Sequence, residues 1–494
     1  MKEKNSAMPP PAAVPALGFM LDVSRGRVPT MPALFRLADR LRLLGFTQLQ
    51  LYVEHTFAFP GHEDVWRGAS PLTAEEIRAL DAHCRSRGVE LVPNLNSFGH
   101  VERWLKHEKY RRFAECPDGF YHELFKMRRP AGTFFPCEET ADFMGALYRE
   151  FLPHFSSDKF NLGGDEPWEL GLGRSRERCA ALGKRAVYVE HMLRLKKRAE
   201  ACGKKIMFWS DVLLGDGDGN ARGGEIPAAL LDGAVPVIWG YEADHPFDAQ
   251  CARVRAALEK TGGSGSFTVA PGTSAWLSFG TRLSNALANI RAAFSAAEKW
   301  RAGGVLLTTW GDAGYHNPPA ANLLPLISCA ALARGDPAPE TPAAFAPALE
   351  KMGVPAAETL AEALFSFGKL DDFISKKIPN RSWIREAFFA KGEAFEKLAA
   401  DVPAAEIAAA AEENARVLKL LGGVPASCPE AAELSVAAEM TAAALRRADA
   451  FLRGDAPARA AAETEAAGPL REKFAAAWRL SCREGGLAES LSFF

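Results

Sequence analysis

The sequence has no excess of charge of either sign and no long apolar run. Its 494 residues hold 59 lysines and arginines against 61 aspartates and glutamates, a formal net charge of −2. A nucleic-acid-binding protein needs a basic excess or stripe, and charge-driven membrane attachment needs a polybasic segment. No stretch of about 18 apolar residues is present, so no membrane span is expected. These absences favour a globular protein that binds neither nucleic acid nor membrane.

Cysteine is sparse, and the spacings that bind metals are missing. The nine cysteines form no Cys-x-x-Cys pair, which argues against a zinc ribbon or a redox motif. Neither His-x-His nor His-Glu-x-x-His occurs among the ten histidines. We therefore predict no metal and no cofactor, and nine thiols that fit a reducing compartment.

The first residues lack the apolar core of a secretory signal. Residues 1–15 hold four prolines and no periodicity, which predicts a disordered leader. We expect a cytoplasmic protein, or a periplasmic or secreted one if a signal has been removed.

Short β-rich apolar runs alternate with longer amphipathic stretches along residues 16–333. There are eight such runs, at 18–23, 47–53, 89–93, 159–164, 205–209, 235–239, 266–271 and 304–310. Between them, apolar side chains recur at helical spacing, as at Leu34, Leu37, Leu41 and Leu44. Thr73 with Glu76 forms the pattern of a helix capping box.

Eight strand–helix units indicate a parallel sheet with right-handed crossovers. An open doubly wound sheet is one solution, but eight is the number that closes a (β/α)8 TIM barrel. We predict that barrel over residues 16–333. The Pro-rich start and Ala- and Glu-rich remainder of residues 334–494 predict an α-helical C-terminal region, which could serve structure or homo-oligomer contacts. An insertion at 101–158 is expected to shape the rim of the site.

Polar and aromatic residues follow every one of the eight runs. Active sites of such barrels lie at the carboxyl ends of the strands, so these residues should converge in one cup. In chain order they are Asp22 and Arg25; Glu54 and His55; Asn94, Asn96 and His100; Asp165 and Glu166; Trp209 and Asp211; Trp239 and Tyr241; Trp276; and Trp310 and Asp312.

The fourth run ends in Gly163-Gly164-Asp165-Glu166, where the glycines allow close approach of backbone and ligand. Two carboxylates in a tryptophan-lined cup suggest glycoside hydrolysis. The usual schemes set the two groups about 5 Å or more apart across the scissile bond, which suits sequence neighbours poorly. Adjacent carboxylates fit substrate-assisted catalysis, in which the 2-acetamido oxygen of the sugar is the nucleophile.

The Gly-Gly-Asp-Glu motif in this setting resembles glycoside hydrolase family 20, the β-N-acetylhexosaminidases. The similarity extends over residues 17 to 320 and matches a bacterial branch that lacks the N-terminal accessory domain. The segments that resemble the family lie at 51–58, 96–100, 206–211, 238–244, 271–276 and 308–312.

The resemblance implies a retaining exo-acting enzyme that hydrolyses terminal β-linked GlcNAc or GalNAc through an oxazolinium intermediate. Asp165 would orient the acetamido group, Glu166 would be the general acid/base, and Tyr241 would bind the acetamido oxygen. His100 would support the position and charge of this general acid. The residues expected to bind the sugar are Trp209, Trp239, Trp276, Trp310, Asp312, Asp211, Glu54 and Arg25.

The sequence departs from the family pattern at three positions. Asn161 stands where a histidine is common before Gly-Gly-Asp-Glu, Leu17 where an arginine often begins the first strand, and Phe98 where proline precedes Gly-His. Asn161 is therefore expected behind the carboxylates rather than against the sugar. These departures affect the pocket floor and the choice of sugar epimer.

Two other functions remain open at this point. One is hydrolysis of a modified, for example sulfated, or extended hexosaminide. The other is a catalytically inactive barrel that binds amino sugars, although the intact Asp165–Glu166 pair argues against it. In each case the partner is a glycan or glycoconjugate with a terminal N-acetylhexosamine.

Overall fold

Eight parallel strands close into a barrel in the computed structural model, which describes residues 14–215, 226–262 and 265–494. Around the barrel the order is β1, β10, β9, β8, β7, β6, β3 and β2. The strands are β1 (Leu17–Asp22), β2 (Gln48–Val53), β3 (Glu90–Leu95), β6 (Lys159–Asn161), β7 (Lys205–Trp209), β8 (Val235–Trp239), β9 (Thr268–Ala270) and β10 (Gly304–Thr309). Each overlaps one of the eight predicted runs. The (β/α)8 barrel is confirmed, and the open sheet is excluded because β1 pairs with β10.

Alternation along the strands divides the core into two parts. On β1, Phe19 and Leu21 face the surrounding helices, whereas Met20 faces the barrel interior. Met20 packs there in a cluster with Met207 and Leu306, from β7 and β10. This period of two explains why the strands read as nearly continuous apolar runs, since both faces are buried.

Helices cover the outside of the barrel, and the expected capping box is in place. The helices of this part are α1 (Met31–Leu44), α2 (Glu63–Trp66), α3 (Ala74–Ser86), α4 (Glu102–Leu105), α5 (Glu108–Arg111), α6 (Glu138–Phe151), α7 (Arg176–Leu182), α8 (Lys184–Glu200), α9 (Asp211–Leu214), α10 (Ala228–Leu231), α11 (Phe247–Lys260), α12 (Leu283–Lys299) and α13 (Leu323–Ala333). Gly45 ends α1 with φ 90°, and the Thr73–Glu76 capping box starts α3. In the described residues no helix is both long and apolar enough to cross a membrane.

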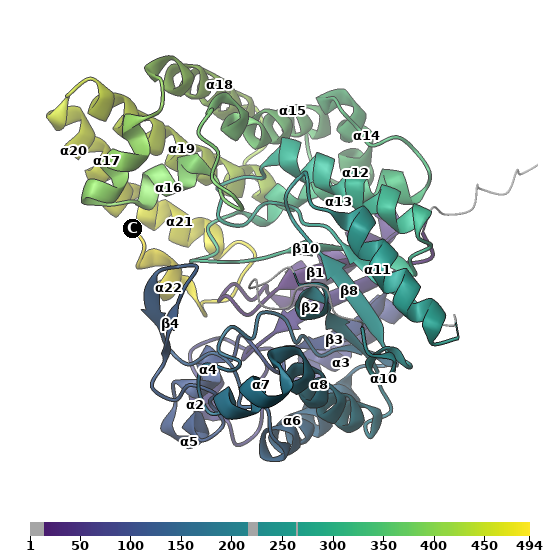
Figure 1. The fold of residues 1–494 in the computed structure, drawn as a ribbon. Coiled ribbons are helices and arrows are strands. Elements are labelled where there is room, and N and C mark those ends of the chain that lie inside the picture. Colours follow the sequence, from purple (N-terminus) through teal and green to yellow (C-terminus); the bar gives the residue numbers. More distant parts are fainter. Residues whose placement is uncertain (1–13, 216–225, 263–264) are drawn as a thin grey trace, which may run out of the picture.

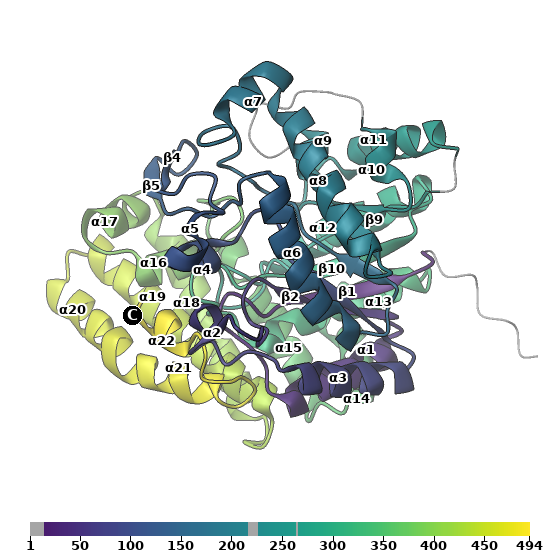
Figure 2. The same ribbon diagram turned by 90° about the horizontal axis from the view of Figure 1, so that it is seen from below.

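The insertion between β3 and β6 forms a short antiparallel hairpin of its own. Its strands are β4 (Phe120–His122) and β5 (Met127–Arg129). The insertion also contains α4, α5 and α6, and Figure 2 shows the hairpin at the periphery of the molecule.

The C-terminal part of the chain is helical, as expected, and packs on one side of the barrel (Figure 1). Its helices are α14 (Pro342–Lys351), α15 (Ala357–Gly368), α16 (Trp383–Phe389), α17 (Gly392–Ala400), α18 (Ala404–Gly422), α19 (Pro429–Leu452), α20 (Ala456–Glu465), α21 (Arg471–Trp478) and α22 (Leu487–Leu491). The longest, α19, packs against α16, α18, α20 and α21 and is the core of this region. The boundaries at residues 15 and 333 stay predictions, and residues 1–13 of the expected leader lie outside the described residues.

One buried arginine, Arg27, bonds both to the barrel part of the chain and to the C-terminal region. Arg27 Nη1 donates to the carbonyl of Asn317 at 2.6 Å, and its Nε donates to Cys482 Sγ at 3.3 Å.

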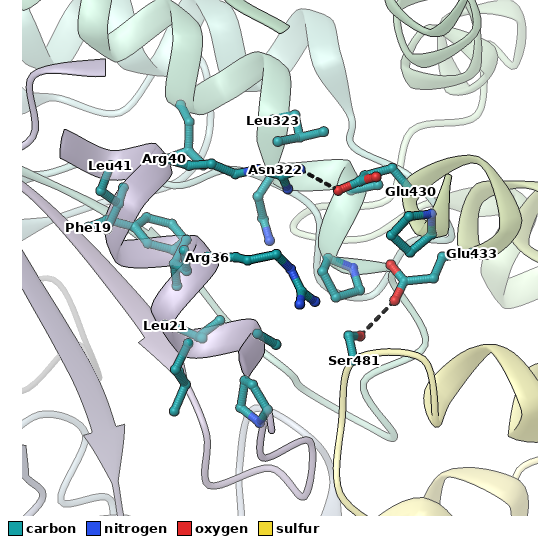
Figure 3. Close-up of a pocket in the computed structure, with 18 of the residues that line it drawn as sticks. Phe19, Leu21, Arg36, Arg40, Leu41, Asn322, Leu323, Glu430, Glu433 and Ser481 are labelled. Carbon is teal, nitrogen blue, oxygen red and sulfur yellow. Dashed lines mark hydrogen bonds and ion pairs between the residues drawn. The ribbon is translucent and has the colours of Figure 1, made fainter. Parts of the chain in front are cut away.

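A cavity of about 120 Å³ remains between α1, α13 and α19. Figure 3 shows its polar edge, where Arg40 pairs with Glu430 at 2.7 Å and Ser481 donates to Glu433 at 2.6 Å.

Candidate active site

The Gly163–Glu166 turn directs two neighbouring carboxylates to the same side. β6 ends at Asn161, and Gly163, Gly164 and Glu166 all have positive φ, at 77°, 91° and 45°. A Cβ on either glycine would collide with another segment of the same chain. The clash would be with Asn96 for Gly163 and with Met192 for Gly164. Only glycine therefore permits this turn. In a regular strand Asp165 and Glu166 would have pointed to opposite faces.

His100 lies between the two carboxylates. Its Nε2 is 3.3 Å from Asp165 Oδ2 and 3.3 Å from Glu166 Oε2. Burial disfavours the imidazolium, but the charge of Asp165 and the hydrogen bonds to both carboxylates keep the pKa of His100 well above its ordinary value. Burial would likewise raise the pKa of Asp165, but His100 holds it below its usual range. Asp165 is thus an anion opposite a cation.

Asn96 fixes the second oxygen of Asp165. Its Nδ2 donates to Asp165 Oδ1 at 3.0 Å and lies 3.0 Å from the hydroxyl of Tyr52. The Tyr52 hydroxyl donates in turn to Glu54 at 2.9 Å. The sequence interpretation did not single out Tyr52, because an aromatic residue inside an apolar strand is normally core.

Arg25 gathers three carboxylates beside the same histidine, since its Nη2 lies 3.4 Å from His100 Nδ1. Its guanidinium is 3.2 Å from Asp22, 3.6 Å from Glu54 and 3.3 Å from Asp312. Burial raises the pKa of Glu54 to about 7, although Arg25 acts to lower it. The side chain of Asp312 is 34% exposed, so it is the member of this cluster most open to a ligand. The structure thus brings together Arg25, Glu54 and Asp312, which sequence reasoning placed at three separate strand ends.

Asp211 lies behind the Glu166 turn. The sequence interpretation expects it to bind substrate, but both of its oxygens accept hydrogen bonds from the protein: Oδ2 from the backbone N–H of Glu166 and Oδ1 from Trp239 Nε1, each at 3.2 Å. Burial, followed by the charges of Asp165 and Glu166, raises the pKa of Asp211 to about 8. In this geometry Asp211 holds the turn and the indole of Trp239.

Aromatic rings pack together next to these charged groups, with Trp209 and Trp276 each 1% exposed and Trp310 8% exposed. The Tyr241 hydroxyl accepts a hydrogen bond from Trp310 Nε1 at 2.9 Å, and the Tyr241 ring stacks on Trp239 with centroids 5.1 Å apart. Trp276 meets Tyr241 edge-on at 4.9 Å, and Trp209 lies 6.0 Å from Trp310. Tyr241 is near enough to Asp165 and Glu166 for their charges to act on its pKa.

Trp276 is held from the C-terminal region. Its Nε1 donates to Asn380 Oδ1 at 3.0 Å. Asn380 has φ 61°, and its backbone N–H donates to Glu242 Oε1 at 2.8 Å, while Glu242 forms a two-fold ion pair with Arg282. Sequence reasoning missed Asn380, which no local pattern marks.

Asn161 lies deeper, inside the barrel. It is fully buried, donates to Gln50 at 3.2 Å and accepts from the backbone N–H of Gly163 at 3.1 Å, so it supports the turn from below. In the part of the chain that the structure describes, no cluster of three or more His, Cys, Asp or Glu side chains is arranged to hold a metal ion.

Comparisons with known proteins converge on one family. Residues 60–227 match the model of the glycosyl hydrolase family 20 catalytic domain. Hexosaminidase D of Bos taurus is 24% identical over 227 residues, which cover 44% of this chain and 61% of that protein. Hexosaminidase D of Homo sapiens is 24% identical over 239 residues, 44% of each chain. The chain thus spans about half the length of these curated relatives.

A solved structure supports the fold at full length. The chitobiase of Flavobacterium johnsoniae superposes with a TM-score of 0.51 at 15% identity, and the match covers 97% of this chain and 78% of that one. At this identity the likeness concerns the fold alone.

Proposed function

The chain belongs to glycoside hydrolase family 20, and from that premise we propose that it is a retaining exo-β-N-acetylhexosaminidase that works by substrate assistance. The substrate is a glycan or glycoconjugate with a terminal β-linked GlcNAc or GalNAc. The observation that carries the proposal is the pair Asp165 and Glu166, turned to one side and meeting at the same nitrogen of His100.

Glu166 is the general acid. Its side chain is 25% exposed, so it reaches the open cup, where it donates a proton to the leaving oxygen as the glycosidic bond breaks. The acetamido oxygen of the same sugar attacks C1 and forms a cyclic oxazolinium. Glu166, now a carboxylate, takes a proton from water as that water opens the ring, and the second inversion restores the β configuration.

Asp165 acts on the acetamido group. It is an anion with an exposed fraction of only 6%, fixed by Asn96 and His100, so it can accept a hydrogen bond from the acetamido N–H. That bond strengthens as positive charge develops on the nitrogen in the transition state. The Tyr241 hydroxyl donates to the acetamido oxygen from the other side.

The aromatic and charged groups around the pair define the sugar pocket. Trp209, Trp276 and Trp310 provide flat apolar walls for the faces of a pyranose ring and the acetamido methyl group. Asp312, with Arg25 and Glu54 behind it, binds ring hydroxyl groups.

The first test is release of nitrophenol from aryl β-GlcNAc, β-GalNAc and β-glucoside. We expect turnover of one or both N-acetyl substrates and none of the glucoside, which lacks the internal nucleophile. Equal rates on the glucoside would contradict the acetamido mechanism. No turnover of any of the three would point to a modified or extended hexosaminide, or to a binding protein.

A further inference from the structure

Exposed apolar side chains are concentrated on the hairpin of the insertion. Among the described residues, nine large apolar side chains are exposed, and four of them lie within seven positions: Tyr121 at 47%, Leu124 at 75%, Phe125 at 42% and Met127 at 52%. Single exposed apolar residues need no explanation, but a contiguous group marks a binding surface.

The pairing of β4 with β5 decides which of these side chains share a face. His122 is paired with Met127, so the two lie on one face, and Tyr121 is paired with Arg128 on the other. Phe125, in the connecting turn, packs against His122 with ring centroids 4.5 Å apart. Phe125, Met127 and His122 therefore form one apolar face, with Leu124 at its tip.

This face continues into the candidate active site. His122 and Phe125 contact Trp168, at centroid distances of 4.4 and 5.6 Å. Trp168 lies 6.1 Å from the ring of His100, whose Nε2 meets Glu166. The charge of Glu166 also acts on His122. The apolar face is thus two side chains away from the proposed general acid.

The base of the hairpin is fixed to the same loops. Glu169, three residues after Glu166, accepts a hydrogen bond from the backbone N–H of Gly132. The backbone N–H of Phe134 donates to Phe98, two residues before His100, at 3.0 Å. The position of the hairpin relative to Glu166 is therefore set by direct contacts.

We propose that Trp168 and the hairpin face of Phe125, Met127 and Leu124 form an aglycone subsite for an apolar leaving group, alkyl or aryl. The inference rests on the proposed function, because a general acid must lie beside the leaving oxygen and the aglycone extends from that oxygen. The sugar itself occupies the tryptophan-lined cup, so the next surface met by the aglycone is Trp168 and the hairpin. Arg129, on this face, is 3.6 Å from Glu102, and Lys126, in the turn, is 2.9 Å from Glu123, so neither of these cations is unpaired.

The test compares methyl and hexyl β-N-acetylhexosaminides, whose alcohols are leaving groups of nearly equal pKa. Any difference in kcat/KM then reports contacts of the aglycone rather than its chemistry. We expect the wild-type protein to favour the hexyl glycoside by about tenfold, mainly through KM. The variant Leu124→Ser/Met127→Ser should reduce this hexyl-to-methyl ratio at least about threefold.

Leu480→Ser is the matched control, since Leu480 is 48% exposed but lies outside the hairpin and the site. Its hexyl-to-methyl ratio should equal that of the wild-type protein. Phe125→Ser provides a second variant on the same face and should shift the ratio in the same direction.

Three outcomes would overturn the inference. The first is a hexyl-to-methyl ratio of kcat/KM near one in the wild-type protein. The second is a ratio that the hairpin variants leave unchanged. The third is a hairpin variant that changes the oligomeric state in light scattering but not the ratio, which would make the face a contact between copies of the chain. Each presupposes turnover of the methyl glycoside. Absence of turnover on all N-acetyl substrates would instead contradict the proposed function.

Discussion

Glu166 holds a left-handed backbone conformation, with φ 45°, at the point where the chemistry is proposed. A residue other than glycine adopts this conformation at an energetic cost, which the surroundings must offset. Here the backbone N–H of Glu166 is bonded to Asp211, and the turn follows two glycines that also have positive φ. The strain directs the carboxylate of Glu166 toward His100 and the open cup.

Substitutions at the two carboxylates should separate their roles. Glu166→Gln should lower kcat on methyl glycosides by about 10²–10⁴-fold, because a poor leaving group needs the proton, and far less on dinitrophenyl glycosides. Asp165→Asn should lower kcat on both by about 10²–10³-fold, because it weakens stabilisation of the intermediate. Steady-state kinetics on the two substrates measure this.

Glu259→Gln, on the exposed side of α11, is the control and should keep wild-type rates. Equal losses on both substrates for Glu166→Gln would show that Glu166 is not the acid.

Glu169 predicts a dependence of stability on pH. Burial raises its pKa from 4.5 to about 8. Between those two values the native state binds a proton that the unfolded state has lost, so the free energy of unfolding falls as pH rises through this interval. In Glu169→Gln that contribution is absent. The advantage in Tm of the glutamine variant over the wild type should therefore grow from pH 5 to pH 8.

Thermal unfolding at pH 5, 6.5 and 8 checks this, with Glu298→Gln on the exposed face of α12 as the control. A difference between wild type and Glu169→Gln that stays constant with pH would contradict the raised pKa.

At the scale of elements, a loop of the C-terminal region completes the wall of the barrel cup. The side chain of Asn380 accepts a hydrogen bond from the indole N–H of Trp276. The backbone N–H of Asn380 donates to Glu242, 138 positions earlier in the chain. A buried donor that loses its partner costs about 1–3 kcal/mol. The loop before α16 therefore bears on the shape of the sugar pocket.

Two substitutions at Asn380 test this contact without straining the backbone. Glycine adopts φ 61° readily but has no side-chain oxygen to accept the hydrogen bond from Trp276. Aspartate tolerates the same backbone conformation and keeps a side-chain oxygen at this place. We expect Asn380→Gly to raise KM for an aryl N-acetylhexosaminide by about tenfold, and Asn380→Asp to stay within about twofold of wild type. Identical KM values for the two variants would show that Trp276 does not need this partner.

The elements themselves could be predicted from the sequence, because their signals are local. The apolar runs, the Thr73–Glu76 capping box and the glycine after α1 all mark positions that the structure confirms. Closure of the barrel followed from the count of runs. The hairpin of the insertion was not predicted, since its strands have three residues each and their exposed apolar side chains resemble no regular pattern.

The candidate site could be predicted only in part. Residues at strand ends, such as Arg25 and Asp312, could be named because the barrel brings those ends together. Their pairing at 3.3 Å, the placement of Asp211 behind Glu166, and the contact of Trp276 with Asn380 depend on side-chain directions and on contacts between distant segments. No periodicity or spacing encodes these features.

At the scale of the whole molecule, one arginine near the C-terminal end joins both parts of the chain. Arg483 lies 2.7 Å from Glu76, and it also donates to the carbonyls of Pro71 and Pro29 at 2.9 and 3.2 Å. These partners all belong to the barrel. Arg483 therefore holds the segment between α21 and α22 against the helix α3.

Arg483→Ala should lower the free energy of unfolding by about 1–3 kcal/mol, because several partly buried acceptors lose their donor together. Arg479→Ala is the matched control: Arg479 is exposed and pairs with Glu484, five residues away, so its loss should leave the free energy of unfolding at the wild-type value. Urea denaturation of the three proteins measures both values. Equal stabilities for the two variants would mean that the segment is held by apolar contacts alone.

The account as a whole depends on the acetamido group being the nucleophile. The most direct measurement is kcat/KM for aryl N-acetylhexosaminides whose acetyl group bears zero, one, two or three fluorines. Fluorine withdraws electrons from the amide oxygen and weakens it as a nucleophile, while the leaving group is unchanged. The account predicts a steep fall in kcat/KM with each fluorine. A rate that does not change across the series would contradict it.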